Sequence, residues 1–206
     1  MFKHFTLTLA TLLCLLLNAC TSGVDDTASV TDLETRKHQM MKITDLEERG
    51  RIGISARYKK ASFAVNSIYH YRKNMFSLEF TGPMGVSYAK LDVYANGSTF
   101  LDVRGTSYSG DNARELLAKE FGIDVPVEKL PFIMFGIPEG DITLDEKGLV
   151  KTAQYKEEYL VTYKEHKLFH SEYLLPTFIE IKTPFTEVIV RISEISRFET
   201  ATDTSL

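Results

Sequence analysis

The sequence predicts a mainly β protein of the α+β class, whose antiparallel strands curl into a closed or nearly closed barrel. Apolar and polar residues alternate with period two through most of the chain after residue 50, which is typical of strands with one buried face. A helical stretch between residues 109 and 138 interrupts this pattern. The other segments amount to about ten strands, more than one flat sheet usually holds, so closure or near closure is expected.

Composition and charge limit the class of protein. The chain has 206 residues, of which 44% are hydrophobic and 11% aromatic, enough to bury the core of one domain. Its formal net charge is −4 and its Lys/Arg runs are no longer than two residues. This argues against a general nucleic-acid binder, which needs a basic surface.

Residues 1–19 read as an export signal. A short charged start with Lys3 precedes an apolar run from Leu7 to Leu17, too short for a bilayer core that needs roughly 20 residues. The signal ends in Leu17-Asn18-Ala19-Cys20, which resembles the bacterial lipobox. Cys20 is therefore predicted to carry a lipid anchor and to become the first mature residue.

The first part of the mature chain is predicted to be a tether and a helix. Residues 20–31 form the lipidated flexible tether, because residues 21–30 are small and polar. Thr31 and Glu34 match a capping box, which predicts a helix over residues 32–48. The folded domain is expected to span residues 32–198, and residues 199–206 are expected to be a tail.

A meander of strands follows, and one of its loops is unusual. Asn96-Gly97 is a strong hairpin signal. The strands around Phe76–Phe80 and Ala89–Val93 are joined by Gly82-Pro83-Met84-Gly85, a turn that places an apolar side chain where turns usually place polar ones. Met84 either folds back over the end of the sheet or projects from it.

Two helices are predicted in the interruption. Ser109 or Asp111 can cap the first, which stops at Gly122, and a short second helix lies between Pro126 and Pro138. Strands then resume after residue 141, over residues 150–155, 159–163, 167–173, 177–182 and 187–198.

Residue patterns that could support catalysis or metal binding are weak. His166 and His170 would stand roughly 13 Å apart on a strand, too far to share a zinc ion. The stretch Gly105–Gly110 does not match a nucleophile elbow and is read as a surface loop. Gly50–Gly53 lacks the Lys-Ser/Thr of a phosphate loop. We therefore expect no enzyme activity, no metal and no cofactor.

The order of these signals resembles the LolB family of outer-membrane lipoprotein receptors. The resemblance rests on several segments: the lipobox at Cys20, Gly50-Arg51-Ile52, Leu78 to Gly85, the helix after Tyr108, Pro126 to Leu130, Gly136-Ile137-Pro138, Leu175-Pro176 and the last long strand. The family usually has tryptophan in the second helical segment and leucine at the loop tip. This chain has no tryptophan, and Met84 stands at the tip.

The resemblance implies an unclosed antiparallel half-barrel whose helices cover an apolar cavity for acyl chains. It also implies a monomer at the outer membrane that accepts lipoproteins from the periplasmic carrier LolA and inserts them into the membrane, with Gly82, Pro83, Met84 and Gly85 as the membrane-insertion loop. The inward side chains expected to line the cavity are Ile54, Val65, Phe76, Leu78, Phe80, Leu91, Val93, Leu101, Leu116, Leu117, Leu130, Phe135, Val161, Ile179, Ile181, Val188 and Val190.

A second class of function stays open at this point. A lipid-anchored scaffold or enzyme could use Cys20 only for attachment and fill its core with its own side chains. A transfer protein needs unfilled apolar space instead. The apolar segment from Val125 to Ile137 favours transfer, because it is too hydrophobic for a surface connection.

Overall fold

The computed structural model describes residues 33–35, 38, 43–58, 61–72, 74–82, 84–169, 173–195 and 199–200. The predicted signal, Cys20 and the predicted tether lie outside these residues. Among the described residues, no helix is both long enough and apolar enough to cross a membrane.

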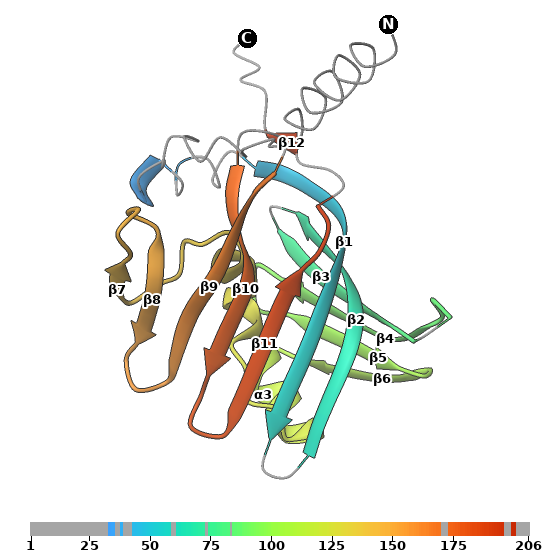
Figure 1. Cartoon of the computed structure of the whole chain (residues 1–206). Helices are drawn as coiled ribbons and strands as arrows, with labels where there is room; N and C mark the ends of the chain where they lie inside the picture. The colour runs from blue at the N-terminus through green and yellow to red at the C-terminus, as the bar shows by residue number, and fades with distance from the viewer. Residues whose placement is uncertain are drawn as a thin grey trace, which may run out of the picture.

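One curved antiparallel sheet forms the body of the protein (Figure 1). Along the sheet the strands follow the order β6-β5-β4-β3-β2-β1-β11-β10-β9-β8-β7, and β12 pairs with β1. The strands are β1 (Ile43–Tyr58), β2 (Ala61–Arg72), β3 (Met75–Thr81), β4 (Ser87–Tyr94), β5 (Thr99–Val103), β6 (Thr106–Gly110), β7 (Asp141–Leu144), β8 (Val150–Tyr155), β9 (Tyr159–Phe169), β10 (Tyr173–Lys182), β11 (Thr186–Ile192) and β12 (Glu199–Thr200). The end strands β6 and β7 do not pair with each other, so the predicted half-barrel is confirmed.

The predicted first helix is wrong in its second half. Residues 33–35 and 38 are helical, but β1 already begins at Ile43. Asp45 and Leu46 pair with Arg72 and Tyr71 of β2. Pairing with distant strands outweighs the local helical pattern, because a strand in the middle of a sheet has backbone hydrogen-bond partners on both sides.

Several strand boundaries also differ from the prediction. The stretch 167–173 is not a separate strand, since β9 and β10 pair directly through Phe169 and Tyr173. The last long strand ends at Ile192, and the first two residues of the predicted tail form β12. The expected surface loop at residues 105–110 contains β6, and β7 adds a strand that alternation had not indicated. Both β6 and β7 are short edge strands, whose register comes from their neighbours.

Two helices and a 3₁₀ turn follow β6: α3 (Ala113–Phe121), η1 (Val127–Lys129) and α4 (Leu130–Met134). The N-cap of α3 is Asn112, not Ser109 or Asp111, because the ladder of β6 continues to Gly110. Its Oδ1 accepts the backbone N–H of Glu115 at 3.0 Å. Gly122 ends the helix as predicted, with φ 68°.

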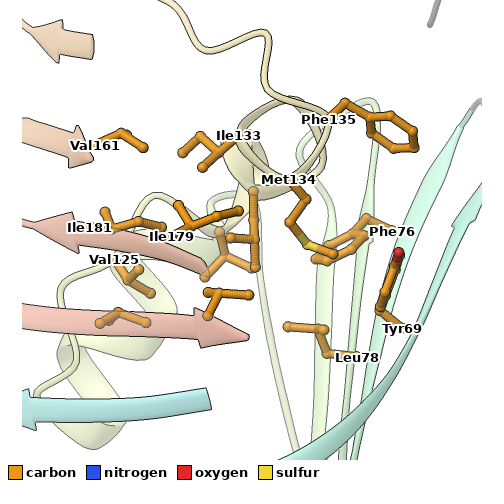
Figure 2. Close-up of a cluster of buried hydrophobic side chains, with 14 of the residues drawn as sticks. Tyr69, Phe76, Leu78, Val125, Ile133, Met134, Phe135, Val161, Ile179 and Ile181 are labelled. Atoms are coloured by element: carbon orange, nitrogen blue, oxygen red, sulfur yellow. The ribbon is translucent and has the colours of Figure 1, made fainter. Parts of the chain in front are cut away.

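The core lies on the concave side of the sheet, where α4 packs between its two halves. Figure 2 shows Met134 directed toward Phe76 of β3, and Ile133 toward Ile179 of β10. Both α4 side chains are almost fully buried. The Tyr163 hydroxyl of β9 donates to the Ile133 carbonyl at 2.9 Å, which fixes the segment to the sheet.

A charged network fixes α3 and the loop after it. Arg114 of α3 donates to both carboxylate oxygens of Asp124, and its Nη1 lies 2.7 Å from Glu158 Oε2 in the β8–β9 turn. The Asp124 backbone N–H donates to Thr186 Oγ1 at 3.2 Å, and its carbonyl accepts from Thr183 Oγ1 at 3.3 Å. The hydrogen bond to Asp124 is the main cause that raises the pKa of Arg114, so the group stays charged. In Figure 1, α3 accordingly lies behind β10 and β11, on the concave side of the sheet.

We expect Arg114→Met to lower the free energy of unfolding by about 2 kcal/mol, because it leaves two carboxylates without their partner. Urea denaturation measures the loss. Lys119→Met is the matched control on the same helix, since the Lys119 side chain is 80% exposed and pairs with the adjacent Glu120. It should cost less than about 0.5 kcal/mol. Equal losses in the two variants would contradict the network's role.

Candidate functional site

An apolar cavity of about 370 Å³ lies on the concave side of the sheet. Its walls come from β2 to β5 and β11, from α3 and from the segment that leads into η1 and α4. The lining residues are Val65, Leu78, Phe80, Tyr88, Ala89, Leu91, Leu101, Val103, Leu117, Phe121, Ile123, Val125, Val127, Leu130, Val188 and Val190. The Tyr88 hydroxyl is the only side-chain polar group in this set, so the cavity suits an apolar ligand.

The predicted lining residues divide into two groups. The structure places Val65, Leu78, Phe80, Leu91, Leu101, Leu117, Leu130, Val188 and Val190 around the cavity. It places Phe76, Val93, Leu116, Phe135, Val161, Ile179 and Ile181 in the packed core instead, outside the lining. Five of these core residues are labelled in Figure 2, around α4. The side chain of Ile54 lies outside the described part of the structure.

The physical reason for this division is the position of α4. Period-two alternation identifies the buried face of a strand, but it does not identify what lies opposite that face. Next to α4, Ile133 and Met134 occupy the space over the sheet. Next to α3, the space over the sheet remains as the cavity, which Leu117 and Phe121 help to line.

Seven lining residues were absent from the prediction: Tyr88, Ala89, Val103, Phe121, Ile123, Val125 and Val127. Val103 continues the alternation of Leu101, and Ile123, Val125 and Val127 alternate with one another, so pattern reading could have found them. Tyr88 gave no such signal. The β3–β4 register shifts between Phe80 and Thr81, and this irregularity allows Tyr88 to line the cavity together with its neighbour Ala89.

The less buried wall of the cavity lies beside the β3–β4 loop. Leu91, Val127 and Leu130 are buried at its base, whereas Tyr88 and Val103 are half-buried and Phe121 is exposed. In the ladder Ala89 pairs with both Phe80 and Val103, so the less buried wall is the end of β3, β4 and β5 nearest this loop. Burial raises the pKa of the Tyr88 phenol, and the positive charge of Arg104 opposes that rise.

The β3–β4 loop presents two apolar side chains to solvent. The Gly82 N–H donates to the Val86 carbonyl at 2.9 Å, and the Gly85 N–H donates to the Gly82 carbonyl at 2.9 Å. Gly85 adopts φ 74°, a conformation that favours glycine. Met84 is 92% exposed and Val86 is 67% exposed. Met84 therefore projects from the turn and does not cover the end of the sheet. Pro83 lies outside the described residues.

Within the described ranges, no group of three or more His, Cys, Asp or Glu side chains could hold a metal ion. His166 lies on β9, and His170 is outside the described residues. The geometry of the site is therefore that of an apolar container beside an exposed apolar loop.

Comparison with known proteins agrees with this geometry. The family model described as outer membrane lipoprotein LolB matches residues 44–194. An outer-membrane lipoprotein LolB of Photorhabdus laumondii is 30% identical over 149 residues, covering 69% of this chain and 71% of the relative. Those of Haemophilus influenzae and Francisella tularensis subsp. tularensis are 26% and 25% identical, covering 93% and 87% of this chain and 95% and 88% of the relatives.

Solved structures share the fold at low sequence identity. A DUF1329 family protein from Desulfovibrio piger has a TM-score of 0.54 and 11% identity, over 85% of this chain and 95% of that one. An outer membrane lipoprotein-sorting protein domain from Vibrio parahaemolyticus has a TM-score of 0.52 and 10% identity, over 84% and 94%. The family model covers most of the chain, and the fold and cavity agree with it: the chain belongs to the LolB family of outer-membrane lipoproteins.

Proposed function

We propose that this protein accepts the acyl chains of lipoproteins in its cavity and releases them into the outer membrane at the β3–β4 loop. The observation that carries the proposal is that the less buried wall of the cavity lies at the end of β3, β4 and β5 nearest the loop that exposes Met84 and Val86. A lipid on Cys20 would hold the protein at the membrane, and a periplasmic carrier of the LolA type would deliver the lipoprotein.

The hydrophobic effect explains why such a container is needed. Each methylene of an acyl chain costs about 0.8 kcal/mol in water, so a triacylated protein does not cross an aqueous compartment unaided. A cavity of about 370 Å³ falls within the usual range of small-molecule sites, which is roughly 300–1,000 Å³. Transfer onward needs no nucleotide, because the bilayer offers the chains an apolar environment at least as favourable as the cavity.

The structure bears on the alternative of a lipid-anchored scaffold. A scaffold gains nothing from unfilled apolar space, whereas the interior here is packed around α4 and hollow beside α3. Phospholipid or fatty acid that stays bound after purification of a Cys20→Ala form would support transfer. A purified protein that neither retains nor takes up lipid would support the scaffold.

Filling the cavity should block acceptance without unfolding the protein. Ala89 lines the cavity on β4 and is 8% exposed, so in Ala89→Phe the phenyl group would occupy space that several methylenes need. We expect lipoprotein uptake from the carrier to fall more than about tenfold, with a melting temperature equal to or above that of the wild type.

The matched control is Ala118→Phe, which adds the same group at an exposed position of α3. It should leave uptake unchanged. If Ala89→Phe accepts lipoprotein as well as the wild type does, the cavity is not the acyl-chain site.

Charge on the loop tip should separate acceptance from release. In Met84→Glu, we expect uptake from the carrier and thermal melting to stay at wild-type values, since the side chain is 92% exposed. Insertion into vesicles should fail, because a carboxylate opposes entry into the bilayer. Met84→Leu keeps the apolar tip and should insert normally. Insertion by Met84→Glu at the wild-type rate would exclude the loop from the release step.

A further inference from the structure

A single arginine stands beside the apolar loop in an unfavourable backbone conformation. Arg104 and Gly105 form the β5–β6 turn with φ values of 53° and 84°. Two positive φ angles mark a type I′ hairpin, whose first position favours Asn, Asp or Gly. Arginine there costs conformational energy, and such strained residues concentrate at functional sites. Asp102 supports the turn, since its Oδ1 accepts the Gly105 N–H at 3.1 Å.

The pairing of the strands places Arg104 next to the loop. The Arg104 N–H donates to the Tyr88 carbonyl at 3.0 Å, and Tyr88 is two residues along the chain from Val86, which directly precedes β4. With strands about 4.8 Å apart and a rise of about 3.3 Å per residue, the backbone of Arg104 lies roughly 8 Å from that of Val86. The arginine side chain can span this distance. The effect of its charge on the Tyr88 pKa also places the guanidinium near the less buried wall of the cavity.

The charge of Arg104 is available to a ligand. Its side chain is exposed, and among the described residues no carboxylate lies within ion-pair distance of it. Asp102 is the nearest acid along the chain, and its two oxygens accept from the Gly105 N–H and, at 3.4 Å, from the Ser107 hydroxyl. By contrast, Arg114 is held by two carboxylates.

We propose that the Arg104 guanidinium binds the phosphate of an anionic phospholipid when Met84 and Val86 enter the bilayer. The inference rests on the proposed membrane role of the loop and adds a headgroup site to it. Guanidinium matches phosphate by paired, charge-assisted hydrogen bonds. Interfacial contacts usually combine apolar side chains below the lipid headgroups with cations and tyrosines at the level of the headgroups. The site would orient the less buried wall of the cavity toward the membrane.

Vesicle binding by the Cys20→Ala form of the protein tests the proposal, because no lipid anchor then masks the contact. Co-sedimentation is measured with vesicles of phosphatidylethanolamine and phosphatidylglycerol, and with vesicles in which phosphatidylcholine replaces the anionic lipid. We expect the wild type to bind the anionic vesicles more tightly than the phosphatidylcholine vesicles. Arg104→Gln should lower the affinity for the anionic vesicles alone by about fivefold, the usual effect of one basic residue near such a surface. Arg104→Lys should keep only part of the preference, because an ammonium keeps the charge but not the paired hydrogen bonds, and high salt should weaken the preference.

Two comparisons make the result decisive. Lys151→Gln removes an exposed positive charge from β8, far along the sheet from the loop, and should bind both vesicles as the wild type does. Met84→Glu should lose binding to both kinds of vesicle. If Arg104→Gln equals the wild type on anionic vesicles while Met84→Glu fails, the headgroup site is wrong and the membrane role of the loop stands.

Other results also overturn the site. If Arg104→Gln lowers the affinity for both kinds of vesicle equally, Arg104 acts on the shape of the loop. If Arg104→Gln leaves the vesicle affinity unchanged but weakens binding to the carrier, Arg104 contacts a protein partner. If Met84→Glu binds both vesicles normally, the proposed function fails first. Thermal melting of each Arg104 variant should match or exceed that of the wild type, since a shorter side chain does not add strain to the turn.

Discussion

The packing of α4 between the two halves of the sheet is the contact on which the interior depends. Ile133 and Met134 fill the space between β3 on one side and β10 on the other. Tyr163 holds the same segment through the carbonyl of Ile133. Because α4 keeps the halves apart, the sheet curls around it without closing. The space that remains beside α3 becomes the cavity.

Polar contacts outside the cavity fix the position of α3, which forms one of its walls, and so help to keep the space open. Arg114, Asp124 and the threonines of the β10–β11 turn fix α3 and the following loop at the rim. Side chains that line an unfilled apolar space lack packing partners on one side, which lowers stability. Larger side chains at Ala89 or Val103 would recover part of that stability. Small residues at these positions make sense in a protein that needs room for an apolar ligand.

Three features meet at one corner of the half-barrel. The half-buried wall of the cavity, the exposed tip of the β3–β4 loop and the β5–β6 turn are joined by adjacent rungs of the same ladder. A ligand that leaves the cavity here passes an apolar loop and a cation within a short distance. Under the proposed function, a lipid that leaves the cavity here would pass directly from the protein to the membrane.

Sequence patterns alone predict most of the strands, the hairpin at Asn96-Gly97, the end of α3 at Gly122 and the apolar tip at Met84. These features depend on local rules: period-two burial, turn chemistry and helix stop signals. The sequence did not reveal that β1 replaces the second half of the first helix, because pairing with β2 is a long-range interaction that outweighs local propensity.

Which inward side chains line the cavity depends on the tertiary structure. Leu78 and Phe76 follow the same alternation on β3, yet Leu78 faces empty space and Phe76 faces Met134. Alternation reports which face of a strand is buried, whereas a cavity depends on how far away the opposite wall lies. That distance is set by the position of α4 and by the register shift at Tyr88, and neither leaves a mark in the local sequence.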